Sequence, residues 1–370
     1  MHDLSRYHRQ MLLPGIGREG QERLRDGTAV VIGCGALGTF LADLLARAGV
    51  GRLLIIDRDV VEITNLQRQV LFDERDVERC MPKAEAAKEK IAHINSQVNV
   101  VAVVDDLNHT NIDRLLGRQV EAGGPTVLVD GLDNFETRFL VNDWAVKRTM
   151  PYVYGGAVGT VGMTMAILPH AGSDATDLPP WQVAGFATPC LRCVFDQAPP
   201  PGLNPTCDTA GVLGPLIGII AGHEAAEALK ILTGNFAAVN RDIVHVDLWS
   251  NTQAGFAVQG AYDTGNCACC RQRRFEYLEG KLAGGTTTLC GRNAVQLSHG
   301  RSDGNIDFNR LAERLEHHGS VKTNRFMVRA DIVEAGSAYE LTLFKDGRAI
   351  VKGTEDQTVA RRIYAKYIGG

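Results

Sequence analysis

The chain has 370 residues, of which 45% are hydrophobic and 22% charged, and a formal net charge of −4 at pH 7. This composition is typical of a globular protein with two or three domains, and the slight acidic excess argues against a general nucleic-acid binder. No apolar run approaches the roughly 20 residues of a membrane span, and the first residues lack the apolar core of a secretory signal. We therefore expect a cytoplasmic protein with no membrane or nucleic-acid partner, in which nine cysteines indicate metal or thiol chemistry before disulfides.

The first part of the chain predicts short strands that alternate with helices. Its apolar runs are rich in β-branched residues and are followed by turn residues or by helical periodicity. Strands are expected at 28–32, 52–57, 98–104 and 126–130, and helices at 37–48 and 83–94. Fully apolar strands in this alternation indicate an α/β fold with a Rossmann-like, mostly parallel sheet covered on both faces.

The middle of the chain is richer in glycine and proline. A strand at 152–154 leads into the glycine-rich segment 155–159, which we interpret as flexible, either approaching a ligand or turning tightly. The prolines of residues 168–207 indicate a crossover loop. The apolar helix that follows includes residues 216–220 and carries His223 and Glu224, which we expect to be surface groups or satisfied core groups.

The last hundred residues differ in charge, with 17 basic against 12 acidic residues from position 271 onward. We place a domain boundary there, which gives a first domain of residues 1–270 and a small α+β domain of residues 271–370. Helices are expected at 308–317 and 355–367, and strands at 325–332, 339–344 and 349–352, with Asp346-Gly347 forming a hairpin turn. The terminal Gly369-Gly370 follows a helix, where glycine is an ordinary C-cap, although a fused carrier tail is the alternative.

A glycine motif marks a nucleotide site after the first predicted strand. Gly33, Gly35 and Gly38 form a GxGxxG pattern that opens the next helix, where free N–H groups and the helix dipole favour phosphate. Asp57 follows at the spacing at which dinucleotide-binding folds place an acid on a ribose hydroxyl. Taken alone, this pattern fits NAD as well as ATP.

Further charged and amide residues favour ATP. They occur in order along the chain at Arg9, Asp59, Asn65, Gln67, Arg68, Lys83, Asp133 and Asn134. Hydride transfer has no use for so many cations and carboxylates around a triphosphate-sized space. Adenylation does, because a leaving pyrophosphate and a strained α-phosphorus require cationic and metal stabilisation.

With these motifs, residues 5–270 resemble the ThiF/MoeB/HesA family, relatives of the ubiquitin-activating enzymes. The resemblance implies an adenylyltransferase that uses ATP and Mg²⁺ to activate the C-terminal glycine of a small ubiquitin-like carrier protein ending in Gly-Gly, with release of pyrophosphate. It also implies a ThiS- or MoaD-type carrier, in sulfur transfer for thiamine, molybdopterin or a related product, and a sulfurtransferase or cysteine desulfurase as the sulfur-donating partner.

The same resemblance implies roles for individual residues. Asp57 would hold the ribose and Asp133, beside Asn134, would bind magnesium. Arg9 would enter the site from the second subunit of a homodimer. The phosphates would be surrounded by the glycine turn and by Asn65, Gln67, Arg68 and Lys83. Ala36 stands where many members have a third glycine, a mild departure that should leave the turn usable.

Two CxxC pairs, Cys190/Cys193 and Cys267/Cys270, have the spacing of a four-thiolate site for structural zinc. The resemblance implies zinc at the same places. Cys269 is an extra thiol inside the second pair and is an alternative ligand.

Two other cysteines are candidates for sulfur chemistry. Cys207 lies in the segment that matches the mobile catalytic cysteine of the family, where a thiolate would attack the acyl-adenylate; a loop cysteine without a catalytic role is the alternative. Cys290 is either a second sulfur-handling thiol or, as we favour, a buried small hydrophobe.

These observations rank four candidate functions by how well the sequence supports them. Adenylation of a carrier protein comes first. The same chemistry on a small-molecule, peptide or tRNA-linked carboxylate is second, and a non-catalytic nucleotide-binding scaffold is third. An NAD oxidoreductase is last, because it leaves the cysteine pairs and the segment Asn65-Leu66-Gln67-Arg68 unexplained.

Overall fold

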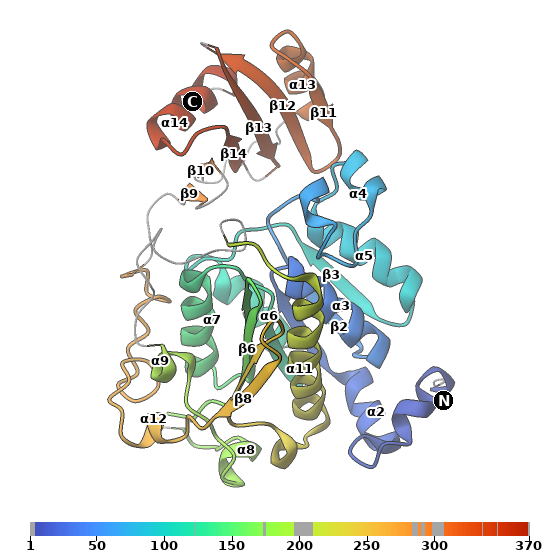
Figure 1. Ribbon diagram of the computed structural model, residues 1–370, viewed down its shortest axis with the longest axis vertical. Coiled ribbons are helices and arrows are strands. Elements are labelled where there is room, and N and C mark those ends of the chain that lie inside the picture. The colour runs from blue at the N-terminus through green and yellow to red at the C-terminus, as the bar shows by residue number, and fades with distance from the viewer. Residues whose placement is uncertain are drawn as a thin grey trace. The chain divides into compact units, whose positions relative to one another are not determined.

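The computed structural model describes residues 4–121, 123–172, 175–195, 210–282, 288–289, 293–297, 307–334, 336–345 and 347–368. The chain divides into two compact units after Ala283 (Figure 1). Within the described residues, no helix is long and apolar enough to cross a lipid bilayer.

The first unit is built on an eight-stranded sheet in the order β3-β2-β1-β4-β5-β6-β7-β8. Neighbours from β3 to β5 are parallel, and those from β5 to β8 are antiparallel. The strands are β1 Thr28–Ile32, β2 Arg52–Ile56, β3 Asn99–Val103, β4 Thr126–Asp130, β5 Tyr152–Val158, β6 Val161–Ile167, β7 Ile243–Asp247 and β8 Thr252–Phe256. The predicted Rossmann-like α/β fold is confirmed.

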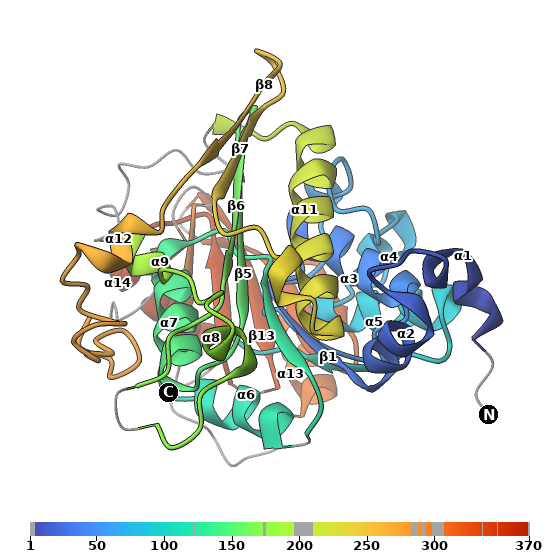
Figure 2. The same ribbon diagram turned by 90° about the horizontal axis from the view of Figure 1, so that it is seen from below.

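Helices cover both faces of this sheet. Figure 2 shows α3 and α11 on one face and α6 and α7 on the other. The α-helices are α1 His8–Met11, α2 Gly17–Asp26, α3 Ala36–Ala48, α4 Glu74–Glu78, α5 Lys83–Ile94, α6 Ile112–Glu121, α7 Phe135–Lys147, α8 Pro180–Val183, α9 Leu191–Val194, α11 Gly214–Thr233 and α12 Gly260–Asp263. Three short 3-10 helices span Ser5–Tyr7, Ile63–Asn65 and Phe236–Ala238.

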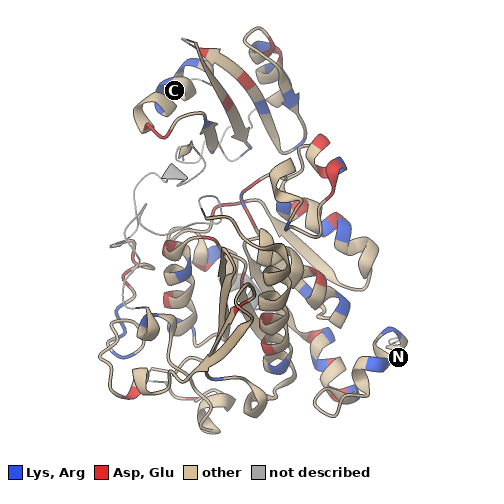
Figure 3. Cartoon of the chain, in the orientation of Figure 1, with Lys and Arg blue, Asp and Glu red and all other residues tan. Residues whose placement is uncertain are grey.

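Burial of apolar side chains fixes the helices on the sheet. On the α7 face, Phe139, Trp144 and Tyr152 are fully buried with the side chains of β1, β2 and β4. Each large side chain of this kind contributes about 1.5–3 kcal/mol on removal from water. On the other face, α11 packs against α3, β5 and β6, and Figure 3 shows the first half of this helix free of charged residues.

The glycine-rich segment after Tyr154 differs from its prediction. Residues 155–158 are not a flexible segment but the second half of β5, paired with β6 throughout. A Cβ on Gly155 would collide with the Glu224 carboxyl group, so glycine is required there by packing. The chain turns only at Gly159, where φ is +61°. The loop predicted at 168–207 contains two one-turn helices, α8 and α9, in its described part.

The second unit is a six-stranded antiparallel sheet in the order β11-β12-β13-β14-β10-β9, with two helices. Its elements are β9 Thr288–Leu289, β10 Ala294–Leu297, α13 Phe308–Glu316, β11 Val321–Thr323, β12 Met327–Glu334, β13 Ser337–Phe344, β14 Ala349–Lys352 and α14 Gln357–Tyr367. Leu311, Leu315 and Ile363 of the helices share one core with the sheet. The hairpin between β13 and β14 is confirmed, with Gly347 at φ +82°; Asp346 lies outside the described residues.

Charge composition places the domain boundary after Cys270, whereas the first compact unit continues to Ala283. Phe275, Tyr277 and Leu278 pack in the core under α7 and so belong structurally to that unit.

Candidate active site

The glycine turn lies between β1 and α3, in contact with the loop that follows β4. Gly33 has φ +88°, and a Cβ there would lie 2.5 Å from the carbonyl oxygen of Gly131. A Cβ on Gly38 would collide with the Gly33 carbonyl. Because side chains are excluded at these positions, backbone N–H groups at the start of α3 stay open to an anion.

Asp57 joins the ends of β1 and β2 at this turn. Its Oδ2 accepts a hydrogen bond from the Cys34 N–H (2.6 Å), and its Oδ1 accepts one from the Asp59 N–H (2.7 Å). Burial raises the pKa of Asp57, Lys83 opposes that shift, and nearby Asp59 adds to it. The position of Asp57 suits a ribose acceptor, because each carboxylate oxygen has a second lone pair.

Lys83 begins α5 at the same edge of the sheet. Its side chain is 4% exposed, and its Nζ lies 3.1 Å from Asp59 Oδ2. Arg58 joins this group, because its Nε lies 3.8 Å from Asp59 Oδ1, and its Nη1 lies 2.8 Å from Asp106 Oδ1. The pair Lys83–Asp59 therefore presents a held ammonium group next to Asp57, as a phosphate site requires.

The segment with Asn65, Gln67 and Arg68 forms a 3-10 turn and a loop. Asn65 is buried, and its Oδ1 accepts the Glu62 N–H in a capping box. Arg68 is half-buried and donates to the Thr64 carbonyl at 3.0 Å, whereas Gln67 is exposed. A Cβ on Gly214 would lie 3.2 Å from the Gln67 carbonyl oxygen, so the start of α11 lies against this loop.

Asp133 is an exposed residue on the loop between β4 and α7. Asn134 caps α7, because its Oδ1 accepts the Thr137 N–H at 2.8 Å, and its Nδ2 donates to Asp133 Oδ1 at 3.4 Å. The loop begins at Gly131, which touches Gly33 of the turn. The structure thus gathers Gly33, Asp57 and Asp133 at the carboxyl ends of parallel strands, where α/β sheets bind ligands.

Within one chain, Arg9 does not lie near the glycine turn. It lies exposed on α1, whose neighbour Gln10 donates to the carbonyl of Ala48 at the last turn of α3 (2.9 Å). The glycine turn lies at the other end of α3. Since α3 has 13 residues and rises 1.5 Å per residue, about 20 Å separates its two ends. Arg9 therefore belongs to the opposite end of the sheet from the glycine turn of its own chain.

A buried polar network, which the sequence analysis did not identify, lies beneath the Asp133 loop. Asp130, at the end of β4, accepts hydrogen bonds from Arg138 Nε (3.1 Å), the Tyr152 hydroxyl (2.5 Å) and the Leu132 N–H (2.8 Å). Arg138 Nη2 donates to the carbonyls of Leu132 (2.7 Å) and Gly155 (2.8 Å). Two features of the sequence could have indicated this network: an aspartate at the end of a buried strand and an arginine in the apolar stretch of α7.

Glu224 lies beside this network on α11, fully buried. Neither carboxyl oxygen has a hydrogen-bond partner of regular geometry among the described residues, although the Asp130 N–H faces the group. Burial, and after it the charge of Asp130, raises the pKa of Glu224 well above its ordinary value, against the opposing effect of Arg138. The prediction of a satisfied core group is therefore wrong for this side chain, and its burial favours the neutral form of the carboxyl group.

We expect Glu224→Gln to be more stable than the parent chain by a margin that grows with pH. In the folded protein, Glu224 keeps its proton at pH values above the pKa at which it loses the proton in the unfolded protein. Its stabilising contribution to the free energy of unfolding is therefore complete in acid and is lost as pH rises. One proton of this kind changes the free energy of unfolding by about 1.4 kcal/mol per pH unit. Chemical denaturation between pH 5 and 8 measures the difference, and parallel curves for the two proteins would contradict it.

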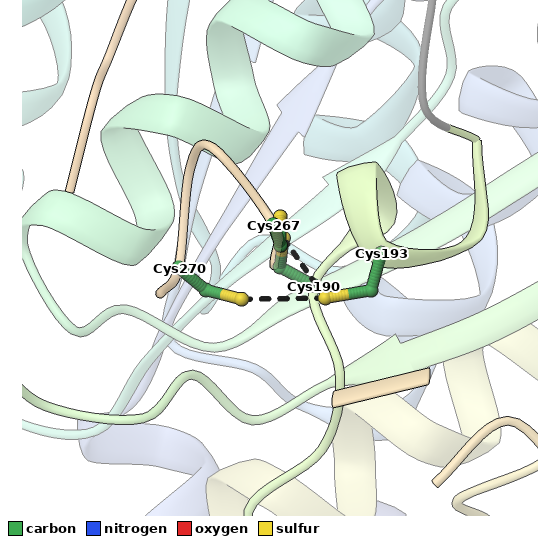
Figure 4. Close-up of side chains that lie close together, drawn as sticks. All are labelled: Cys190, Cys193, Cys267 and Cys270. Carbon is green, nitrogen blue, oxygen red and sulfur yellow. Dashed lines mark hydrogen bonds between the residues drawn. The ribbon is translucent and has the colours of Figure 1, made fainter. Parts of the chain in front are cut away.

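Four cysteines form a compact sulfur cluster beside α7 and α9 (Figure 4). The Sγ atoms of Cys190, Cys193, Cys267 and Cys270 all lie within 4.8 Å of one another. The Sγ atom of Cys190 lies 3.8 Å from that of Cys193 and 3.7 Å from that of Cys267, and the Sγ atoms of Cys193 and Cys270 are 3.3 Å apart. Zn–S bonds of about 2.3 Å in a tetrahedron place sulfurs about 3.8 Å apart, so the four thiols fit zinc.

Helix α7 supports this cluster from outside. Asn142 Oδ1 accepts the Leu191 N–H (2.8 Å) and its Nδ2 donates to the Cys269 sulfur (3.4 Å). Asp143 accepts the Tyr277 N–H at 3.0 Å; burial raises its pKa to about 6, against the effects of Cys269 and Arg192. Cys269 thus lies beside Cys190 but is not one of the four grouped sulfurs.

Several predicted features fall outside the described residues. They are Cys207 with the proline-rich segment before it, Cys290, and the terminal Gly369-Gly370.

Comparison with known proteins gives concordant matches. The chain matches the model of the ThiF family over residues 7–269. It is 39% identical to the Sulfur carrier protein ThiS adenylyltransferase of Bacillus subtilis (strain 168), over 98% of this chain and 99% of that one. It is 41% identical to the Sulfur carrier protein adenylyltransferase of Thermus thermophilus, over 63% of this chain and 79% of that one. The Bacillus match therefore extends over the second unit.

Among solved structures, the chain is similar to Escherichia coli MccB crystallised with ATP. The TM-score is 0.55 at 21% sequence identity, and the match covers 72% of this chain and 75% of that one. At this identity the likeness concerns the fold.

Proposed function

The chain belongs to the ThiF family, and from this membership we propose that it is an ATP-dependent adenylyltransferase for a ThiS-like sulfur-carrier protein. The observation that carries the proposal is the match over nearly the full length of both chains to an adenylyltransferase with that substrate. It is supported by the gathering of the glycine turn, Asp57, Lys83 and Asp133 at one edge of the sheet.

The proposed reaction joins the carrier's C-terminal glycine to AMP. A carboxylate oxygen of that glycine forms a bond to the α-phosphorus, and the bond from this phosphorus to the bridging oxygen of the β-phosphate breaks. The products are an acyl-adenylate and pyrophosphate. No protein nucleophile is needed, so the chain's contribution is to position two anions and to screen their repulsion.

Binding and screening are divided among the residues described above. Backbone N–H groups at the start of α3 bind phosphate and Asp57 binds the ribose. Lys83, held by Asp59 at 3.1 Å, and Arg68 supply positive charge that is in place before the reaction. Preorganised charge of this kind is worth more in a site of low dielectric than in water.

Magnesium fits the exposed carboxylate of Asp133, which has the side-chain amide of Asn134 beside it, because oxygen ligands of this type suit a hard cation. When bound, the ion neutralises charge on the triphosphate and the leaving pyrophosphate. Zinc would be held by Cys190, Cys193, Cys267 and Cys270 as a structural ion, since four thiolates leave no open coordination position.

A homodimer is part of the proposal, because Arg9 cannot reach the glycine turn of its own chain. We expect Arg9→Ala to lose most of the exchange between ATP and pyrophosphate while it stays dimeric. Mixing it with Asp133→Ala, after dissociation and reassociation, should restore activity, since one site of each mixed dimer then has both residues. Sedimentation and exchange assays check this; full activity of Arg9→Ala would show that the arginine is not required.

The acyl carbon of the adenylate then forms a bond to sulfur supplied by a cysteine desulfurase or a sulfurtransferase, and its bond to the phosphate oxygen breaks, so that AMP leaves. Cys207 is the proposed residue for a covalent link to the carrier. The role of the second unit in this sequence is also part of the proposal: a dimer-shaping or carrier-docking function.

Mass spectrometry of the carrier tests the proposed function. A ThiS-type carrier incubated with the protein, ATP and Mg²⁺ should gain the mass of one AMP group, and the same carrier without its terminal glycines should not. Labelling of the truncated carrier, or of a small-molecule carboxylate but no carrier, would contradict the proposed substrate.

A further inference from the structure

The arginine of the buried network suggests a role that rests on the proposed function. We propose that Arg138 is a positioning residue, which fixes the loop carrying Asp133 beside the glycine turn. It acts through the backbone of Leu132, the residue directly before Asp133, and touches no substrate.

Both polar groups of the Leu132 backbone are held by one ion pair. The N–H of Leu132 donates to Asp130 Oδ1 (2.8 Å), and its carbonyl accepts from Arg138 Nη2 (2.7 Å). Asp130 and Arg138 are themselves joined at 3.1 Å. The peptide units on either side of Leu132 are thus fixed, and with them the direction in which Asp133 leaves the loop.

The same guanidinium joins this loop to the next strand. Arg138 Nη2 also donates to the Gly155 carbonyl in β5 (2.8 Å), and the guanidinium lies over the rings of Phe135 and Tyr154 at 5.5 and 5.2 Å. Its place is therefore determined from α7 and from the sheet together. A lysine cannot replace it, because one ammonium group lacks the planar fork that reaches a carboxylate and two carbonyls.

Burial sets Arg138 apart from a surface residue that binds phosphate. Its side chain is 8% exposed, and its Nε and Nη2 groups donate to Asp130, Leu132 and Gly155. This separates Arg138 from Arg68, which lies half-exposed at the surface. Asp130, with its Oδ2 3.1 Å from Arg138 Nε, supplies the counter-charge.

The test compares Arg138→Lys with Arg148→Lys. Arg148 follows the same helix, α7, and pairs with Asp113 at 2.9 Å on the surface, with half of its side chain exposed. The control therefore makes the same chemical change without touching the loop. Two readouts are measured: deuterium uptake of the peptide that contains Leu132, without turnover, and the Mg²⁺ concentration that gives half-maximal ATP–pyrophosphate exchange.

We expect faster uptake at Leu132 in Arg138→Lys and a half-maximal Mg²⁺ concentration about 10- to 100-fold higher, the usual cost of losing a residue that orients a metal ligand. Arg148→Lys should match the parent in both. If Arg138→Lys does not fold, Tyr152→Phe, which removes one hydrogen bond to Asp130, should shift both readouts in the same direction by less.

Parent-like uptake and parent-like Mg²⁺ dependence in a folded Arg138→Lys would overturn the proposal. A lower melting temperature with unchanged Mg²⁺ dependence would also overturn it, because that result marks a purely structural residue. Absence of exchange in the parent protein contradicts the proposed function instead, and deuterium uptake then still decides whether Arg138 fixes the loop.

Discussion

Asp133→Ala is expected to lower ATP–pyrophosphate exchange by about 10²- to 10³-fold, the usual cost of removing one electrostatic contact to a transition state. The side chain is exposed on the loop after β4, so the fold loses no core packing and the melting temperature should change little. The loss should fall on the chemical step, because in the proposed function this carboxylate would hold the ion that neutralises the leaving pyrophosphate.

Glu136→Ala is a matched control for this prediction. Glu136 is an exposed acidic residue three positions further on, in the first turn of α7. It should keep parent-like exchange, since it lies beyond the capping residue Asn134. Retained exchange in Asp133→Ala would remove Asp133 from the site and leave the position of magnesium without support.

Cys190→Ser is expected to abolish stoichiometric zinc, which we predict at about one ion per chain, and to destabilise the first unit by at least about 4 kcal/mol. Losses of this size are typical when a structural metal site is broken. Cys190 is almost fully buried in the core under α7, so the three remaining thiols and the new hydroxyl stay in an apolar surrounding without the ion. Elemental analysis and thermal melting measure the two effects.

Cys269→Ser provides the control, because Cys269 lies beside Cys190 without belonging to the group of four. It should retain the full zinc content and lose only the contact with Asn142. Zinc content unchanged by Cys190→Ser would contradict the assignment of the site, and loss of zinc in Cys269→Ser alone would make Cys269 the ligand.

Features that depend on neighbours in the sequence could be predicted well. The turn at Gly33–Gly38 follows from backbone sterics within a few residues, and β1 and β4 are continuous apolar runs because both faces of those strands are buried. The CxxC pairs were recognisable because each supplies two ligands from one short segment. The antiparallel strands β7 and β8 were not predicted, since β8 is exposed along its whole length and lacks apolar alternation.

Features that depend on distant segments could not be predicted. Arg138 and Glu224 lie 86 positions apart in the sequence, and their common surroundings arise only when α7 and α11 pack on opposite faces of the sheet. Because glycine usually marks turns, the sequence predicts a flexible segment at Gly155, whereas in the structure this glycine leaves space for Glu224. Cross-subunit use of Arg9 was implied by family resemblance alone, and the structure adds the distance that prevents its use within one chain.

The most direct test of the account is ATP–pyrophosphate exchange on the purified, zinc-loaded protein with candidate carriers. ThiS-type and MoaD-type carriers are compared, each with and without its terminal Gly-Gly. The account predicts exchange with the intact ThiS-type carrier and none with its truncated form. Absence of exchange with every carrier, in correctly folded protein, would contradict it.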